Sequence, residues 1–309
     1  MKSFYINRAN PQFGGPATFG WRLKQELIRQ GHDFKKKATN NIAIIDGAYN
    51  DNSFNLLRLD GLCLDSSDQH CQIKNEPIFR CYEKFDHIIF QSQFSKDVYE
   101  SFTGITKENT IIHNGVPPDF HSDISHPYVE NFDKVVIASA KWRRHKRLEE
   151  VMAAFNSPKL KNIALLVLDG QNYKPAAQYV QSTDAQNIIL FPKISHDKLP
   201  EIYATADAMV HLSWLDWCPN TVVEGLACGL PVLCSHNGGT HELVKDNGIT
   251  LNLEEDYSMG TPVDLYNPPE VDVEIIVNGI LDILEKPSGF HRPDLAISNV
   301  ANQYIKLLK

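Results

Sequence analysis

Short apolar runs rich in β-branched residues alternate with helix-period patterns along the whole chain, which is typical of parallel sheets built from strand–helix units. In the first half, such runs predict strands at 3–6, 42–46, 87–91 and 110–113. Helical periodicity in the same half predicts helices near 16–30, 76–84 and 94–102. The second half repeats the plan, with strands predicted at 135–139, 163–168, 187–191, 208–212 and 231–235. The pattern therefore predicts an α/β protein with two Rossmann-like, doubly wound domains.

One segment, 114–133, interrupts this alternation, because it is rich in Pro, Asp and Ser and has no apolar periodicity. We predict a linker there, with an N-terminal domain over 1–130 and a second domain over 131–290. The last stretch, 291–309, has apolar residues at helical spacing and predicts a C-terminal helix that packs back toward the N-terminal domain. Open α/β sheets bind ligands at the carboxyl ends of their strands, so we expect the two domains to face each other across a ligand-binding cleft.

Composition and charge exclude several classes of protein. The 309 residues are 42% hydrophobic and 22% charged, as in ordinary globular proteins. A formal net charge of -8 argues against a nucleic-acid-binding surface, which needs clustered Lys and Arg. No stretch approaches the ~18 apolar residues of a membrane span, and the N-terminus has no signal-peptide run. These features predict a cytoplasmic protein.

The six cysteines form no CxxC pair, so we expect free, buried thiols. A zinc site made of Cys63, Cys71 and Cys81 with His70 and His87 is the less favoured alternative, because the gaps between these residues are irregular. We therefore expect no metal.

Two carboxylates, Asp216 and Glu224, stand on either side of a Pro-Asn-Thr sequence. The apolar residues that follow lie on one face of a short helix, namely Val222, Val223, Leu226 and Ala227. We predict that Glu224 points away from this buried face and that Asn220 caps the helix. A helix N-terminus suits a phosphate, and carboxylates suit the paired hydroxyls of a sugar or ribose. The alternative is ordinary, with Glu224 a solvated helix residue and Asp216 a turn residue.

The residues around Asp216 and Glu224 favour a functional role over the ordinary alternative. Ser213, Asp216-x7-Glu224, "GLACGLPVLCS" and Gly238-Gly239 with Glu242 follow one another in an order and spacing that resembles the donor-site signature of retaining GT-B glycosyltransferases, family 4 especially. The resemblance implies that the first acid contacts hydroxyls of the transferred sugar and that the second binds the nucleotide ribose. It also places the intervening Cys218, Pro219, Asn220 and Thr221 at the donor. This chain departs from the family in having Asp216 where Glu is usual.

A basic cluster, Lys141, Arg143, Arg144, Lys146 and Arg147, follows the first predicted strand of the second domain. A solvated helix start and a nucleic-acid patch are the alternatives to a functional role. In the resembling family an Arg and a Lys five residues apart hold the donor diphosphate, and Lys141 with Lys146 has this spacing. Arg143 or Arg144 is then expected to supply a bidentate contact, and the cations would replace a metal.

Three further positions follow from the resemblance. Gly14 and Gly15 lie between the first predicted strand and a helix, where the family's glycine loop approaches the donor phosphates. Ile194 lies in a loop expected to pack on the base. Asp60 lies where the family often has a histidine near the reacting centre, and is expected to orient the acceptor or to stabilise positive charge on the sugar. A plain Asp-Gly turn is the alternative for Asp60.

The resemblance implies transfer of a sugar from a UDP- or GDP-sugar to a hydroxyl acceptor in glycan, polysaccharide or glycolipid synthesis, with retention at the anomeric carbon and no cofactor. Asp216, Lys146 and Asp60 are the expected catalytic residues. Peripheral membrane contact is a further expectation, and nucleic acid is not an expected partner. The alternatives are a GT-B epimerase or phosphorylase, and a non-catalytic module that binds nucleotide sugars or glycans.

Overall fold

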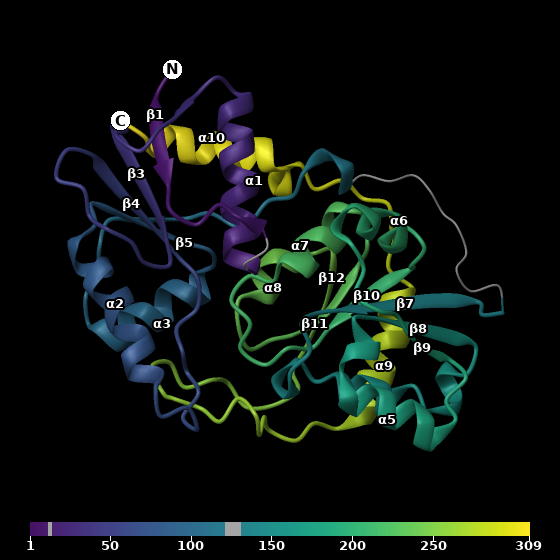
Figure 1. Ribbon diagram of the computed structural model, residues 1–309. Coiled ribbons are helices and arrows are strands. Elements are labelled where there is room, and N and C mark those ends of the chain that lie inside the picture. Colours follow the sequence, from purple (N-terminus) through teal and green to yellow (C-terminus); the bar gives the residue numbers. More distant parts are fainter. Residues whose placement is uncertain (12–13, 121–130) are drawn as a thin grey trace. The chain divides into compact units, whose positions relative to one another are not determined.

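The computed structural model describes residues 1–11, 14–120 and 131–309 (Figure 1). These residues form two compact units. Unit 1 contains Met1–Pro118, Ser258–Asp264 and Pro293–Lys309, and unit 2 contains Asp119–Tyr257 and Leu265–Arg292. The boundary at 118/119 lies inside the predicted linker. The division nevertheless differs from the predicted domains at two places. Its boundary precedes the predicted one at 130/131, and residues 258–264 leave unit 2 and hydrogen-bond within unit 1.

Unit 1 is built on a parallel six-stranded sheet with the strand order β2-β1-β3-β4-β5-β6. Its strands are β1 Ser3–Ile6, β2 Asp33–Phe34, β3 Asn40–Ile44, β4 Phe54–Leu59, β5 His87–Phe90 and β6 Asn109–Ile111. Its α-helices are α1 Gly15–Arg29, α2 Cys71–Lys84, α3 Gln93–Thr103 and α10 Ile297–Leu307. Strand order reverses at β1, because β2 lies on one side of it and β3 on the other.

The core of unit 1 follows from strand alternation. Phe4, Ile6, Ile42 and Ile44 point to one side of β1 and β3, where they pack against α1 and α10. The terminal helix α10 contributes Tyr304 to this core, and its ring lies against Phe19 of α1 with centroids 6.1 Å apart. The chain terminus is thus part of unit 1.

Unit 2 is a second parallel six-stranded sheet, ordered β12-β11-β10-β7-β8-β9. Its strands are β7 Lys134–Ser139, β8 Ile163–Leu168, β9 Ile188–Leu190, β10 Ala208–His211, β11 Val232–Ser235 and β12 Gly248–Leu251. Its α-helices are α4 Leu148–Ala154, α5 Lys174–Thr183, α6 Leu199–Tyr203, α7 Asn220–Ala227, α8 Thr240–Val244 and α9 Val273–Leu284. This is the Rossmann strand order, and the direction of winding reverses between the two neighbours β7 and β10.

Each of the nine predicted strands lies on a strand of the structure, but three strands were missed. The most instructive of these is β4, because it buries Asn55 and Arg58 and therefore shows no continuous apolar run. Helix α2 begins at Cys71, ahead of the predicted start near 76, and Pro77 lies inside it. Proline is common in a first helical turn, but Pro77 lies in the second turn of α2.

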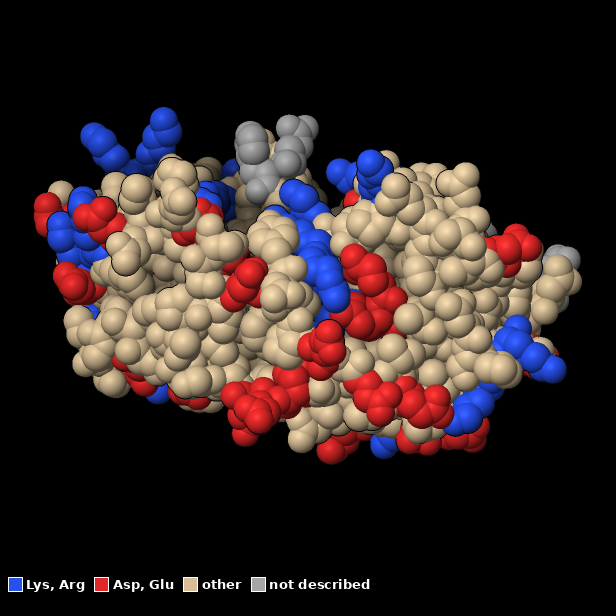
Figure 2. All heavy atoms as spheres, turned by 90° about the horizontal axis from the view of Figure 1, so that it is seen from below, with Lys and Arg blue, Asp and Glu red and all other residues tan. Residues whose placement is uncertain are grey.

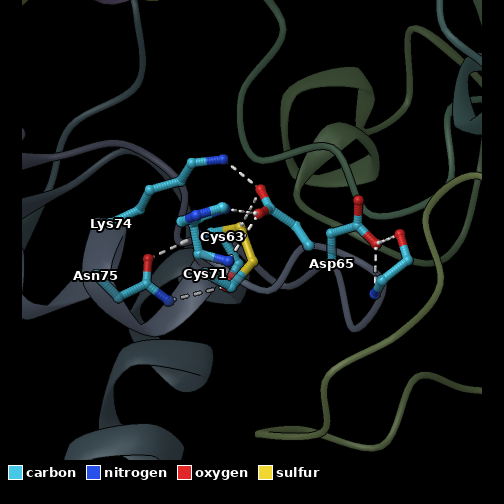
Figure 3. Close-up of a disulfide and its surroundings, with 8 residues drawn as sticks. Cys63, Asp65, Cys71, Lys74 and Asn75 are labelled. Carbon is cyan, nitrogen blue, oxygen red and sulfur yellow. Dashed lines mark hydrogen bonds and ion pairs between the residues drawn. A yellow bond between two sulfur atoms is a disulfide. The ribbon is translucent and has the colours of Figure 1, made fainter.

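The expectation of free thiols is wrong for two cysteines, because Cys63 and Cys71 form a disulfide (Figure 3). The loop after β4 is held on α2 beside this bond, since Asn75 accepts a hydrogen bond from Cys63 N and donates one to Cys63 O, both at 2.8 Å. Lys74 pairs with Asp68 in the same loop. In the zinc alternative, Cys81 and His87 lie outside the only described group of three potential ligands, Cys63, Asp68 and Cys71.

Removing the disulfide should destabilise the protein measurably. The bond closes a sequence separation of 8, for which loop-closure entropy corresponds to a stabilisation of about 2 to 3 kcal/mol. The double variant Cys63→Ser/Cys71→Ser should lose this amount in urea unfolding without reductant, and added reductant should remove the difference from the parent. Cys81→Ser, which alters a free cysteine of the same helix, is the matched control. Equal stability of parent and double variant without reductant would contradict a structural role.

Candidate functional site

The two loops that the sequence analysis singled out in unit 2 leave neighbouring strands. The basic segment follows β7, and the segment with Asp216 follows β10. Parallel strands present their carboxyl ends at one edge, and the winding reverses between these two strands. Ligands of open α/β sheets bind at such a reversal, so the fold itself brings the two motifs together.

Asp216 and Lys146, both predicted to be catalytic, are direct partners. Oδ2 of Asp216 accepts a hydrogen bond from Lys146 Nζ and lies 3.0 Å from His211 Nε2. Its Oδ1 accepts a hydrogen bond of 2.9 Å from Trp217 N. Burial alone would raise the pKa of Asp216, but the Lys146 ammonium and His211 outweigh it and hold that pKa well below its usual range. Asp216 is therefore an ionised, oriented carboxylate.

A glycine turn after β11 fixes the backbone of Asp216. Gly239 N donates to Asp216 O at 2.7 Å, and Asp216 forms an isolated parallel bridge with Gly238. A Cβ at Gly238 would lie 2.6 Å from Asp216 O, and its φ of 99° lies in the left-handed region. Only glycine meets both conditions. The Gly238-Gly239 turn of the sequence motif thus holds the carboxylate in place.

His145, which the sequence analysis did not single out, links the loop after β7 to the loop after β10. It is buried, and its carbonyl oxygen accepts a hydrogen bond of 2.8 Å from Trp214 N. Burial, with the neighbouring Lys146 ammonium, lowers the pKa of His145 to about 4. Burial likewise lowers the pKa of His211. Both imidazoles are neutral near pH 7, so neither compensates the charge of Asp216, and the Lys146 ammonium does.

The residues of the basic cluster have different environments. Arg147 is buried, donates to Pro269 O at 2.9 Å and pairs with Glu254 at 2.8 Å. Arg144 pairs with Glu150 at 2.6 Å. Lys141 and Arg143 are exposed, and neither pairs with an acidic side chain of the described residues. Three residues of the cluster were predicted to contact a diphosphate and are not engaged by Glu150 or Glu254: the exposed Lys141 and Arg143, and Lys146, which pairs with Asp216.

Glu224 is not the solvated helix residue of the ordinary alternative, because it is only 2% exposed. Its Oε1 lies 3.2 Å from Nε2 of His196, and it also contacts the buried Tyr203, whose hydroxyl donates to Ser139 Oγ at 3.2 Å. The eight-residue helix α7 is covered on both faces, so a position outside the apolar stripe is still buried.

The N-terminus of α7 also differs from the prediction. Pro219 occupies the N-cap position, Asn220 is the first helical residue, and no side chain caps the helix. Proline tolerates this place because its missing N–H would have no partner there. Cys218 is buried beside it, and Thr221 follows in the first turn. At the other end Gly229 has a φ of 79°, as the predicted helix stop requires.

The remaining predicted residues are placed as follows. Ile194 lies half-buried in the loop after β9 of unit 2. In unit 1, Gly14 is the N-cap of α1 with a φ of 92°, and Gly15 is its first residue. Asp60 directly follows β4 and pairs with Arg58, whose side chain is 1% exposed. Asp60 therefore neutralises a buried cation, which a plain turn residue would not do.

Comparisons with known proteins place the second half of the chain in a family context. Residues 126–263 match the model of the family "Glycosyl transferases group 1". A segment of 119 residues, 38% of this chain, is 27% identical to N-acetyl-alpha-D-glucosaminyl L-malate synthase of Bacillus anthracis, and the match spans 31% of that protein.

Solved structures show the same fold. HepE of Anabaena, in complex with UDP and glucose, superposes with a TM-score of 0.70 at 14% identity, covering 99% of both chains. Sucrose-phosphate synthase of Thermosynechococcus elongatus gives a TM-score of 0.66 at 14% identity, covering 100% of this chain and 95% of that chain. The chain has the GT-B fold that the sequence analysis predicted.

Two surface observations bear on the predicted partners. Figure 2 shows blue and red side chains interspersed over the face that it presents, which is not the extended basic surface of a nucleic-acid-binding protein. Among the described residues, no helix is long and apolar enough to cross a membrane.

Stability should fall as the pH drops through the range in which His145 would titrate. The folded pKa of His145, about 4, lies below the ordinary value of 6.5, so the unfolded chain binds more protons between them. His145 alone should therefore remove about 2 kcal/mol of stability between pH 7.5 and pH 5. Urea unfolding at the two pH values measures this loss. His145→Gln should show a loss smaller by that amount, and an unchanged loss would contradict a buried, neutral His145.

Proposed function

We propose that the protein transfers a sugar from a nucleoside diphosphate sugar to a hydroxyl acceptor, since residues 126–263 match the model of the family "Glycosyl transferases group 1". The observation that carries the proposal is the Lys146–Asp216 pair at the reversal of the unit 2 sheet, beside the N-terminus of α7. A UDP-sugar is the favoured donor, since structural neighbours are complexes with UDP and with UDP-glucose. A GDP-sugar is the second candidate.

The cations suit the leaving group. When the glycosidic bond breaks, negative charge develops on the diphosphate, and positive groups placed there stabilise the transition state. Lys141 and Arg143 are exposed and available to the diphosphate, and Lys146 is held nearby through Asp216. The N–H groups of the first turn of α7, at Asn220 and Thr221, suit a phosphate as well. In this proposal, side chains and backbone N–H groups of the protein stabilise the negative charge on the leaving diphosphate.

Asp216 suits the transferred sugar. A carboxylate has about four acceptor sites, and three are used by Lys146, His211 and Trp217 N. The remaining capacity can accept a hydrogen bond from a sugar hydroxyl, in a direction fixed by the three existing bonds. Glu224 is proposed to meet the ribose, with His196 as the side chain that moves to admit it, since His196 is half exposed. Retention at the anomeric carbon rests on the family resemblance.

The acceptor side is proposed to lie in unit 1. Asp60 is charge-paired with Arg58, so its role there is to hold a cation and to orient a hydroxyl acceptor. Gly14 and Gly15 at the start of α1 are proposed to approach the donor phosphates, since the φ of 92° at Gly14 exposes backbone where a side chain would stand. The acceptor is a glycan, polysaccharide or glycolipid hydroxyl, and peripheral membrane contact and a cytoplasmic location are part of the same proposal.

The first test is nucleotide affinity. Calorimetric titration with UDP, GDP and ADP should give one clearly preferred nucleotide. Glu224→Gln keeps the size of the side chain but loses its charge, and a hydrogen bond to a charged group contributes about 1.5 to 3 kcal/mol. The Kd of the preferred nucleotide should therefore rise by about ten- to a hundredfold. Glu285→Gln, at an exposed position after α9, is the control. An unchanged Kd in Glu224→Gln would refute the assigned ribose contact.

The second test treats Lys146 and Asp216 as one unit. Lys146→Met and Asp216→Asn should each lower kcat by about a hundred- to a thousandfold at saturating UDP-sugar, with a smaller change in the Kd of UDP. The double variant should be no slower than the slower single variant, because the pair works together. Lys134→Met, which removes an ammonium paired with Asp207 on the surface, is the control. Multiplying effects of the two substitutions would show that the residues act separately. Free sugar or an epimer as the sole product would favour a hydrolase or an epimerase over transfer.

A further inference from the structure

Unit 1 contains a polar cavity that no step of the proposed reaction uses. Its volume is about 450 Å³, within the ~300 to 1,000 Å³ of small-molecule sites. The lining comes from β1, from β3 with the residues just before it, and from the loop between β3 and β4. Five of its residues are asparagines: Asn7, Asn40, Asn41, Asn50 and Asn52.

The cavity exists because the connection from β3 to β4 contains no helix (Figure 1). Strand alternation sends Phe4, Ile6, Ile42 and Ile44 to the core on one side of the sheet, so Tyr5, Asn7, Asn41 and Ala43 face the other side. A loop, 45–53, covers that side over β1 and β3 where a helix would otherwise pack. The cavity thus lies over one face of β1 and β3, the two strands between which the winding of this sheet reverses.

A network of amide groups makes the floor of the cavity rigid. Asn41 donates to Ala48 O and to Asn55 Oδ1, both at 2.9 Å. Asn55 Oδ1 also accepts from Asn50 N at 2.9 Å, and Asn55 Nδ2 donates to Asn50 O at 3.0 Å. Asp86 closes the network by accepting from Asn55 N at 2.8 Å. The loop is therefore held in one conformation, as preorganised binding requires.

Several polar groups of the lining have no partner among the described residues. They are the hydroxyl of Tyr5, the carbonyl oxygen of the Asn41 amide, the NH₂ group of Asn50, the side-chain amide of Asn52, and the charged groups of Lys36 and Asp51. Hydrogen bonds within the chain fix the other half of Asn41 and of Asn50, so their remaining groups are directed rather than freely rotating. Each is a group that a ligand could satisfy.

The chemistry of these groups selects the ligand. One cation and one anion leave the cavity without net charge, which does not suit a phosphate or a nucleotide. Amides offer a donor and an acceptor together, as vicinal hydroxyls require, and Tyr49, 40% exposed, offers a ring for an apolar sugar face. We propose that this cavity binds neutral carbohydrate, one or two sugar residues at the end of a glycan. None of the lining residues is among those proposed to contact the donor, so this proposal stands whether or not the proposed transfer occurs.

The test is NMR of the full chain with ¹⁵N-labelled asparagine, titrated with D-glucose or N-acetyl-D-glucosamine to about 100 mM, which covers Kd values of about 1 to 10 mM. UDP is present throughout at saturating concentration, so that the site in unit 2 is filled. The side-chain amide signals of Asn41, Asn50 and Asn52 should shift and saturate together. Tyr5→Phe removes only a hydroxyl, and Asn52→Ala removes only an exposed amide. Each should raise the sugar Kd at least threefold without changing the Kd of UDP.

Two controls make the outcome decisive. Asn278→Ala, an exposed position on α9 of unit 2, should leave the sugar Kd unchanged. Glycerol at the same concentration should not saturate the cavity signals, because it has vicinal hydroxyls but no ring face to lie against Tyr49. The proposal is overturned if the cavity signals stay still, if asparagines across both units shift alike, or if UDP alone moves the cavity signals. Because Glu224→Gln affects only the nucleotide, a failed sugar titration and a failed donor assignment are distinguishable.

Discussion

The ion pair between Lys146 and Asp216 joins the loops that leave the two central strands of unit 2. Both side chains are mostly buried, so each charge needs the other, and removing one partner of such a pair typically costs about 3 to 5 kcal/mol. The backbone of Asp216 is held in addition by Gly239 N, and that of His145 by Trp214 N. Three loops are therefore fixed around one charge pair, and they carry Lys146 and Asp216, the pair on which the proposed function rests.

Burial and pairing fix the charges of this region. Two buried imidazoles, His145 and His211, are kept neutral by burial, so the ammonium of Lys146 is the charge that neutralises Asp216. Arg147 and Arg144 are engaged by Glu254 and Glu150 and serve the packing of unit 2. Only part of the basic cluster is thus left for a ligand, at Lys141 and Arg143. A dense run of cations in sequence is in this way divided between side chains that pair with acids and side chains that stay exposed.

Unit 1 uses different means to hold its polar interior. Arg58 is buried under the ring of Phe19, 4.4 Å from its centroid, and is neutralised by Asp60 at the end of the same strand. The loop that follows is fixed by the Cys63–Cys71 disulfide and by Asn75, and residues 258–264 add a backbone pair to it, with Val263 N donating to Leu64 O at 2.8 Å. The loop between β3 and β4 is fixed by asparagines instead of by apolar packing. Because asparagines hold this loop, polar groups line the cavity beneath it.

Local sequence determined the features that depend on neighbouring residues. These are the strands whose carboxyl ends are followed by the motifs, the helix stop at Gly229, and the glycine turn at Gly238. The GT-B fold followed from the same alternation together with the family signature. Tertiary structure decided the rest. Periodicity treats a side chain outside the apolar stripe as exposed, yet Glu224 is buried because a second layer, with His196 and Tyr203, covers the other face of a short helix. It also decided the pairing of Lys146 with Asp216, the disulfide across the loop after β4, and the return of residues 258–264 to unit 1. The ion pair and the return of residues 258–264 join positions far apart in the chain, which meet only when the strands assemble. The two cysteines are only eight positions apart, but their pairing depends on how the loop after β4 lies against α2.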